Sequence, residues 1–311
     1  MTIKEIYNLA IKKGIENDFR GKKGVDQMME RRKKSYEKMS KKNKEYFDKE
    51  DLTNPYSDTR ILYGDEKKKV KKALVGIDID GEELLYAKQR GDIDLVISHH
   101  PRGKGLLGLD SVMDLQVDLL HYYGVPINIA EKLLKKRISE VSRGIAPGNH
   151  YRAVDMARLL DIPFMCVHTP ADNMVAKFIE KAIEKKKPYF VEDLMGHLLE
   201  VEEYKIAKKM GAGPRLFVGS ESNRAGKVVV TEVTGGTEGS PQIYEKLAQA
   251  GAGTVVGMHM SEKHREEAEK AHINVVIAGH ISSDSIGVNL FLDLLQGVEV
   301  VSCGGLIRVS R

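Results

Sequence analysis

The chain has 311 residues, a length that suits two domains better than one. Hydrophobic residues make up 41% of it, no apolar run approaches the ~18 residues of a membrane-spanning helix, and the two cysteines, Cys166 and Cys303, lie in apolar segments, so we expect a cytoplasmic protein with no disulfides and no membrane partner. The net charge of +4 is uneven: residues 1–72 hold 21 Lys and Arg against 13 Asp and Glu, an excess of 8 that leaves −4 for the remainder.

The first 53 residues are predicted to form a charged helical extension. Apolar residues at Ile3, Ile6 and Leu9 predict a helix over 2–13, and residues 24–48 read as a long exposed helix or a partner-contacting arm. Turn residues from Asn54 end the arm. Its lysines and glutamates are interspersed, which favours a solvated surface. Contact with an acidic partner or with nucleic acid is the alternative.

From Lys71 onward, predicted strands and helices alternate, as in βαβ units with a mainly parallel sheet. The strands are expected at 73–78, 95–98, 126–130, 162–167, 215–219, 227–233, 254–259, 273–278 and 298–309. The helices are expected at 81–89, 110–123, 131–142, 150–160, 171–186, 191–210 and 241–250.

Histidines stand where several of these apolar runs end. The runs lead into the adjacent pair His99-His100, His168, His259 and His280. Imidazoles gathered at strand ends are typical of divalent-metal sites, because open α/β sheets bind ligands at the carboxyl ends of their strands. Pro101 favours an extended conformation at His100 where the chain turns, so the pair can present two imidazoles to two ions.

Two of the histidines are followed four residues later by an aspartate, in His168-Thr-Pro-Ala-Asp172 and His280-Ile-Ser-Ser-Asp284. If each segment enters a helix, residues i and i+4 share a face and the two side chains converge. A lone strand-end histidine is usually a hydrogen-bonded core residue, and a lone pair is usually an ion pair. The combination favours a metal site, and the repeated strand–His–Asp pattern indicates two related α/β halves.

The candidate ligands suffice for two divalent ions, with one carboxylate as a bridge. Mixed nitrogen and oxygen ligands suit Zn, Mn, Fe, Co or Ni rather than Ca or Mg. Two ions ~3.5–4 Å apart activate a bound water as nucleophile and clamp an oxyanion, so metal-assisted hydrolysis is the default chemistry. His259 has no aspartate at i+4 and is expected beside the ligands or facing the substrate.

A glycine-rich segment, Thr234-Gly-Gly-Thr-Glu-Gly-Ser240, lies between a predicted strand and a predicted helix. Glycines let the backbone approach a ligand, and a helix N-terminus attracts anions. No Gly-Lys-Ser/Thr follows, so it is not a Walker loop. A plain tight turn is the alternative to phosphate binding, for which the candidates are Gly235, Gly236, Thr237, Gly239 and Ser240.

Four segments together resemble the Nif-three-like family, whose members are often called type 2 GTP cyclohydrolase I. These are Asp94-Leu-Val-Ile-Ser-His-His-Pro101, the unit ending at Asp172, the glycine-rich segment, and Ala278-Gly-His-Ile-Ser-Ser-Asp284. They occur in the family's order over residues 55–311. Residues 54–64 also resemble a divergent form of the family's early Asp-Asn-x-Gly-Leu segment.

The resemblance implies two α/β domains with mixed, mainly parallel sheets, a dinuclear metal site at their interface, and a toroidal homohexamer. We place the first domain at 54–174 with 275–311 and the second at 175–274. Asp284 stands where the family usually has Glu, so a bridging carboxylate would be one methylene shorter. Carried over by motif, the ligands would be His99, His100, Asp172, His280 and Asp284, with His168 nearby.

These features predict a metal-dependent hydrolase of the cyclohydrolase or phosphoesterase type, acting on a nucleotide or another phosphorylated small molecule. Arg102 or the glycine-rich segment could hold the phosphate. The alternative is a non-catalytic metal-binding adaptor or regulatory protein that acts through its oligomeric surface and basic arm. The arm lacks a recognised nucleic-acid motif, so its charge alone suggests that partner.

Overall fold

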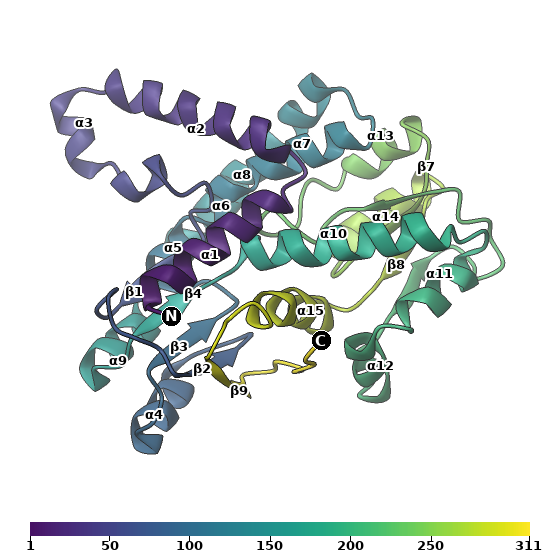
Figure 1. Cartoon of the computed structure of the whole chain (residues 1–311). Helices are drawn as coiled ribbons and strands as arrows, with labels where there is room; N and C mark the ends of the chain where they lie inside the picture. The colour runs from purple at the N-terminus through teal and green to yellow at the C-terminus, as the bar shows by residue number, and fades with distance from the viewer.

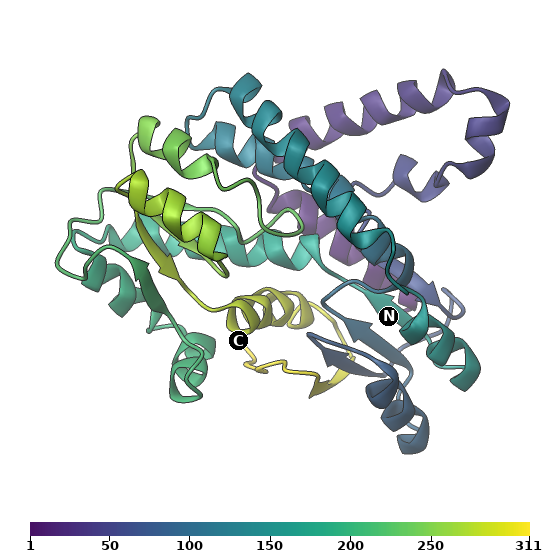
Figure 2. The same ribbon diagram turned by 180° about the vertical axis from the view of Figure 1, so that it is seen from behind.

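The computed structural model describes residues 1–311 and contains two separate β-sheets with helices packed around them (Figures 1 and 2). The first sheet has five strands in the order β1-β4-β3-β2-β9. β1 runs antiparallel to β4, and the other neighbours are parallel. Its strands are β1 Arg60–Tyr63, β2 Lys72–Gly76, β3 Leu95–Ser98, β4 Phe164–Cys166 and β9 Glu299–Cys303.

The second sheet repeats the plan of the first. Its order is β5-β8-β7-β6, with β5 antiparallel to β8 and the remaining neighbours parallel. Each strand corresponds to the one numbered four lower in the first sheet, and β9 is an addition at the first sheet's edge. The prediction of two related α/β halves is therefore confirmed. The strands are β5 Arg215–Val218, β6 Lys227–Val230, β7 Ala252–Gly257 and β8 Asn274–Ile277.

Helices fill the connections, and none is both long and apolar enough to cross a lipid bilayer. The first ten α-helices are α1 Ile3–Glu16, α2 Gly21–Glu37, α3 Lys41–Tyr46, α4 Gly81–Arg90, α5 Gly103–Leu107, α6 Leu109–Val112, α7 Asp114–Tyr122, α8 Ile127–Ile145, α9 Arg152–Leu160 and α10 Thr169–Lys186. The remaining helices are the 3₁₀ helix η1 Lys49–Leu52, α11 Val191–Leu198, α12 Glu202–Lys209, α13 Ile243–Gln249, α14 Glu262–Lys270 and α15 His280–Leu292.

The strand expected at 126–130 is wrong, because these residues start helix α8. Pro126 is the N-cap of α8, where its missing N–H costs nothing, and Ile129 and Ala130 donate their N–H groups to its carbonyl. A short apolar run does not distinguish a strand from a buried helical turn, so the local pattern was ambiguous. The helix expected at 191–210 is also two helices, α11 and α12.

The N-terminal extension is only partly detached from the body. In α1, Ile3, Ile6 and Ala10 are fully buried in the core of the first sheet, and Thr2 and Glu5 form a capping box at its start. Beyond α1, the helices α2 and α3 project from the body as an arm (Figure 1), in which Val25 is the one buried residue. The predicted exposed helical character applies to this arm rather than to α1.

The long connection between β3 and β4 carries α7 and α8 to the second sheet. Leu115, Leu119 and Leu134 share a hydrophobic cluster with Val229 and Val255 of the second sheet. Helices α7 and α8, which lie between β3 and β4 in the chain, thus pack in the core of the other half. The domain boundaries remain predictions.

α10 and α15 lie side by side at the centre of the molecule (Figures 1 and 2). A Cβ at Gly287 of α15 would lie 2.4 Å from Ala171 O of α10, so only glycine permits this approach. Each helix follows a strand of a different sheet, β4 or β8. The crossing therefore brings the starts of these two helices together.

Candidate metal centre

His99 and His100 directly follow β3, whose four residues are all buried. Their N–H groups donate to Gly76 O and Ile77 O, each at 2.9 Å, so the pair continues along the end of β2. The side chain of His99 is fully buried, and that of His100 is 21% exposed. Two imidazoles are thereby held at the carboxyl edge of the first sheet.

His168 and Asp172 come from the start of α10. His168 is the N-cap residue, and the N–H groups of Ala171 and Asp172 donate to its carbonyl at 2.8 and 3.1 Å. Pro170 is accommodated in the first turn, as the sequence predicts. Both side chains point to the same side of the turn, with His168 Nε2 3.7 Å from Asp172 Oδ2.

His280 and Asp284 come from the second half, at the start of α15. Gly279 precedes this helix with φ +108°, and a Cβ there would lie 2.6 Å from Ser282 Oγ and 2.8 Å from Ala212 O. The sharp entry from β8 into α15 therefore requires glycine. Asp284 is fully buried, whereas the side chain of His280 is 42% exposed.

The six side chains predicted from the two halves converge. His99 Nε2 lies 3.3 Å from Asp172 Oδ1 and 3.5 Å from Asp284 Oδ1. Asp284 Oδ2 is also 3.3 Å from His100 Nε2 and 3.6 Å from His280 Nε2. Two triads, His99/His100/Asp284 and His99/His168/Asp172, have ligand atoms that all lie within 4.8 Å of one another.

The converging atoms suit metal coordination better than hydrogen bonding to one another. Both carboxylate oxygens of Asp172, both of Asp284, and His99 Nε2 are buried and have no hydrogen-bond partner. Such buried orphans cost stability unless something else satisfies them. Ligands ~2.1 Å from a tetrahedral ion are ~3.4 Å apart, and the distances of 3.3–3.7 Å match this spacing.

Charge pairing shifts the titration of these groups. Burial alone would lower the pKa of His99, but Asp284 and Asp172 outweigh it and hold that pKa well above the usual value. Burial would likewise lower the pKa of His100, but Asp284 and Asp78 stabilise its charged form, so that this pKa is raised. Burial would raise the pKa of Asp284, but the imidazoles beside it hold that pKa far below the usual range. The pKa of His280 is lowered, chiefly by burial.

Two aspartates that the sequence analysis did not single out orient the imidazoles. His100 Nδ1 lies 3.0 Å from Asp78 Oδ1, and His168 Nδ1 lies 2.8 Å from Asp58 Oδ2. Such contacts fix the ring and leave Nε2 free for a metal. Asp58 lies in the 54–64 segment that resembles an early family motif, which was a usable signal, and Asp78 ends the apolar run of β2.

His259, predicted near the site, lies two residues beyond β7. Its ring centroid is 5.0 Å from that of His280, and its Nδ1 is 3.5 Å from Glu238 Oε1. Glu238 is a neighbour of this histidine that the sequence motifs did not indicate.

The glycine-rich segment packs against α6 and α7. Gln116 Nε2 donates to Gly235 O at 2.8 Å and to Thr237 O at 2.6 Å. The N–H of Gly239 donates to the buried carboxylate of Glu232, so that donor is already engaged. Gly236 has φ +92°, and a Cβ there would lie 3.0 Å from Leu109 O. These contacts explain the glycines by packing, and phosphate binding by the segment, including Ser240, remains a prediction.

Comparison with known proteins shows similarity in structure. A NIF3 superfamily protein from Sphaerobacter thermophilus is 29% identical over 80% of this chain and 92% of its own, with a TM-score of 0.71. Reduced HcgD from Methanocaldococcus jannaschii is 19% identical over 84% of this chain and 94% of its own, with a TM-score of 0.49. No family model and no curated protein matches the sequence.

Proposed function

Because this chain belongs to the NIF3-like family, we propose that it binds two divalent metal ions and is a metal-dependent hydrolase of the cyclohydrolase or phosphoesterase type. Its substrate would be a nucleotide or another phosphorylated small molecule. The single observation behind the metal centre is the pair of fully buried carboxylates, Asp172 and Asp284, whose oxygens have no hydrogen-bond partner and face imidazoles from both halves.

The residues present would divide the ions between two groups. His99, His168 and Asp172 would hold one ion, and His100, His280 and Asp284 the other, with Asp284 near enough to His99 to bridge them. Ions so held would activate water and polarise an oxygen of the substrate. We leave the metal open among Zn, Mn, Fe, Co and Ni, which this mixture of imidazoles and carboxylates suits.

Exposure suggests the side from which a substrate would reach the centre. The side chains of His99, Asp172 and Asp284 are fully buried, whereas those of His100 and His280 are 21% and 42% exposed. A substrate would therefore approach past His100 and His280, and the buried side would exclude water.

Arg102 stands at this rim. Its guanidinium lies 3.3 Å from Asp78 and 3.2 Å from Asp80. It would have to leave these carboxylates to bind a phosphate, so a binding role predicts that Arg102→Gln raises KM more than it lowers kcat.

The test combines elemental analysis with a hydrolysis screen on GTP, other nucleotides and bis(p-nitrophenyl) phosphate. We expect about two ions per chain, turnover that a chelator abolishes, and loss of both in Asp284→Asn. Asp293→Asn is the matched control, because it makes the same change near the end of α15, where Asp293 pairs with Arg308. Metal content and turnover unchanged in Asp284→Asn would contradict the proposal.

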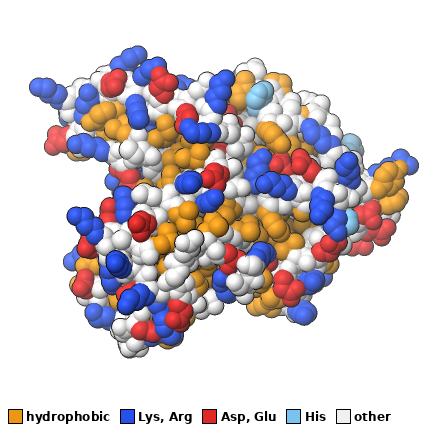
Figure 3. Space-filling view, in the orientation of Figure 1, with side chains coloured by type: hydrophobic (Ala, Val, Ile, Leu, Met, Phe, Trp, Pro, Cys, Tyr) orange, Lys and Arg blue, Asp and Glu red, His pale blue; other side chains and the backbone are white.

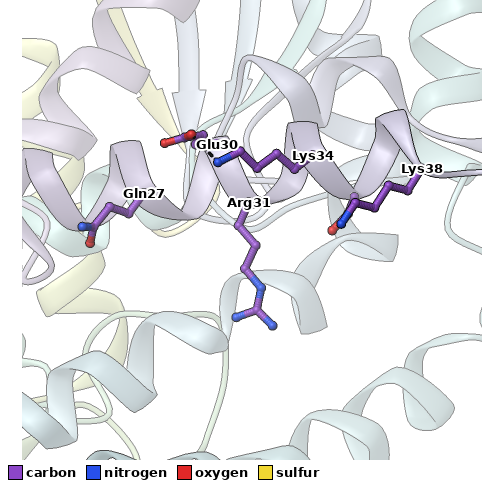
Figure 4. Close-up of a pocket in the computed structure, with 6 residues that line it drawn as sticks. Gln27, Glu30, Arg31, Lys34 and Lys38 are labelled. Atoms are coloured by element: carbon purple, nitrogen blue, oxygen red, sulfur yellow. Dashed lines mark ion pairs between the residues drawn. The ribbon is translucent and has the colours of Figure 1, made fainter.

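A second candidate function is that of an adaptor acting through the arm. Lys and Arg side chains are interspersed with Asp and Glu over the arm (upper left in Figure 3). Along α2, Glu30 and Lys34 pair at 2.6 Å while Arg31 points to another side of the helix (Figure 4). A groove of about 1010 Å³ separates the arm from α7 and α8, and its cations include Arg31, Lys132 and Lys135.

Charge reversal tests this candidate without disturbing α1, whose burial rules out a simple deletion. Lys33→Glu with Lys38→Glu would weaken binding to random single-stranded RNA or to an acidic peptide, as judged by fluorescence anisotropy. Lys67→Glu with Lys88→Glu makes the same charge change on the body. Equal binding by the two variants would contradict an arm-specific role. Light scattering would test the homohexamer that we also propose.

A further inference from the structure

The candidate centre contains one imidazole more than the family resemblance implies. Five rings form a row in the order His168, His99, His100, His280 and His259. The successive centroids are 4.9, 5.4, 5.3 and 5.0 Å apart. His259 is therefore spaced from its neighbour like every other ring in the row.

Rings that share an ion lie at about this spacing, as do the neighbouring rings His99 and His100 of the two proposed ions. An imidazole nitrogen binds ~2.1 Å from an ion and the ring centre lies ~1.1 Å further, so two rings at tetrahedral angles have centroids ~5 Å apart. The 5.0 Å between His259 and His280 meets this condition as closely as the 5.3 Å between His100 and His280.

The placement of His259 Nδ1 beside a carboxylate resembles that of Nδ1 in His100 and His168. In His99, His100 and His168, Nδ1 faces an oxygen acceptor within 3.0 Å and Nε2 faces the buried aspartates. In His259, Nδ1 is buried without a hydrogen-bond partner and lies 3.5 Å from Glu238 Oε1, which leaves Nε2 for another partner. A carboxylate on one nitrogen and a metal on the other is the common arrangement for a histidine ligand.

Glu238 is itself held in place. Arg137 Nε donates to its carbonyl at 2.9 Å, and His264 Nδ1 lies 3.9 Å from its Oε2. His264 is anchored in turn, because Nε2 contacts Gly239 O at 3.1 Å and Nδ1 contacts Ser261 Oγ at 2.6 Å. The segment that carries Glu238 is therefore tied to α8 and to the start of α14.

The internal repeat is an independent argument. β3 ends at Ser98 and His100 lies two residues further on, while its counterpart β7 ends at Gly257 and His259 lies two residues further on. Each half thus places a histidine with a carboxylate on Nδ1 at the same point, His100 with Asp78 and His259 with Glu238.

We propose that His259 is a further metal ligand, bound through Nε2 to the ion that His100, His280 and Asp284 hold, and that Glu238 positions it. This inference rests on the proposed dinuclear centre. It does not depend on whether the protein is a hydrolase.

The experiment compares His259→Gln and Glu238→Gln with the full-length wild-type chain, using Co²⁺ as the probe. Competition with a chromophoric chelator would give both affinities, and the visible absorption of Co²⁺ reports its coordination. We expect His259→Gln to weaken one of the two ions ~10–100-fold and change its spectrum, and Glu238→Gln to weaken the same ion ~10-fold. His197→Gln is the matched control, since His197 faces Glu200 at 3.1 Å outside the row and should leave both ions unchanged.

Unchanged affinities and spectra in His259→Gln and Glu238→Gln would overturn the proposal. Circular dichroism of the metal-free variants separates a lost ligand from a misfolded chain, and Glu238→Gln decides the question if His259→Gln does not fold. A wild-type chain that binds two ions but hydrolyses nothing would contradict the proposed hydrolase and leave this inference standing. A wild-type chain that binds no ion would contradict both.

Discussion

Asp78 shows how an exposed residue can act on a buried centre. Its carboxylate is 3.0 Å from His100 Nδ1 and fixes the ring that reaches Asp284. Replacing a carboxylate in this position typically weakens metal binding ~10–100-fold. We expect Asp78→Asn to weaken one ion by this factor in a chelator-competition titration.

Asp80→Asn is the control for Asp78→Asn. Asp80 shares Arg102 with Asp78, but His100 contacts only Asp78 of the two. Metal affinity should therefore remain at the wild-type value in Asp80→Asn. An equal loss in both variants would show that Arg102, rather than the orientation of His100, matters.

The pKa shifts predict that metal binding depends on pH. The raised pKa of His99 means that a metal must displace a proton from it up to a pH above 6.5, its ordinary value. As the pH is lowered, apparent affinity should fall about tenfold per pH unit for each displaced proton, and the fall should begin above pH 6.5. Affinities measured in metal buffers from pH 6 to 9 check this, and a flat profile would contradict it.

The His99 contribution to the stability of the metal-free protein depends on pH in the opposite direction. A raised folded-state pKa contributes stability below the unfolded value of 6.5, and this contribution is lost as the pH rises through the folded pKa of His99. The lowered pKa of Asp284 contributes stability above its unfolded value of 3.8 and loses it as the pH falls through its folded value. Near neutral pH, raising the pH should thus tighten metal binding while it removes the His99 contribution to the stability of the empty fold.

At the scale of elements, the crossing of α10 and α15 sets the distance between Asp172 and Asp284. Gly287→Ala would place a Cβ 2.4 Å from Ala171 O and force the helices apart. We expect a loss of ~1–3 kcal/mol in the free energy of unfolding and weaker metal binding. Urea unfolding of the metal-free protein measures the first effect, and chelator competition measures the second.

Gly144→Ala provides the control for the crossing. Gly144 lies in α8, and a Cβ there would meet nothing within 4 Å. This change should stabilise the helix by ~0.5–1 kcal/mol and leave the metal centre unaffected. A similar gain in Gly287→Ala would mean that the helices can separate without cost.

At the scale of the whole molecule, the centre joins two halves that otherwise have separate sheets. His99 follows β3 and Asp172 lies in α10 after β4 of the first sheet, whereas His280 and Asp284 lie in α15 after β8 of the second sheet. Metal at 100 times its dissociation constant would stabilise the fold by ~2.7 kcal/mol, so its removal should lower Tm by several degrees. Thermal unfolding with metal and with chelator checks this, and Asp284→Asn should show a much smaller difference.

Local chemistry in the sequence determined much of the candidate site. Apolar runs ending in histidine predicted strand ends, and the spacing of four residues between His168 and Asp172 predicted a shared helix face, because both follow from the geometry of a few consecutive residues. The strand expected at 126–130 is wrong because that short apolar run fitted a strand as well as a helix. Asp78 was not predicted because an isolated aspartate carries no periodic signal, whereas Asp58 lies in the 54–64 segment, whose resemblance to a family motif was a usable signal.

Only the tertiary structure decided how the two halves meet. The convergence of Asp172 and Asp284 depends on Gly287 at a helix crossing, and the pairing of His259 with Glu238 depends on a loop packed beside β7. These contacts join residues 21 to 116 positions apart, and no local pattern encodes such distances. The sequence by itself determined the kinds of ligands and the strands and helices that carry them, whereas long-range packing decided which ligands share a site.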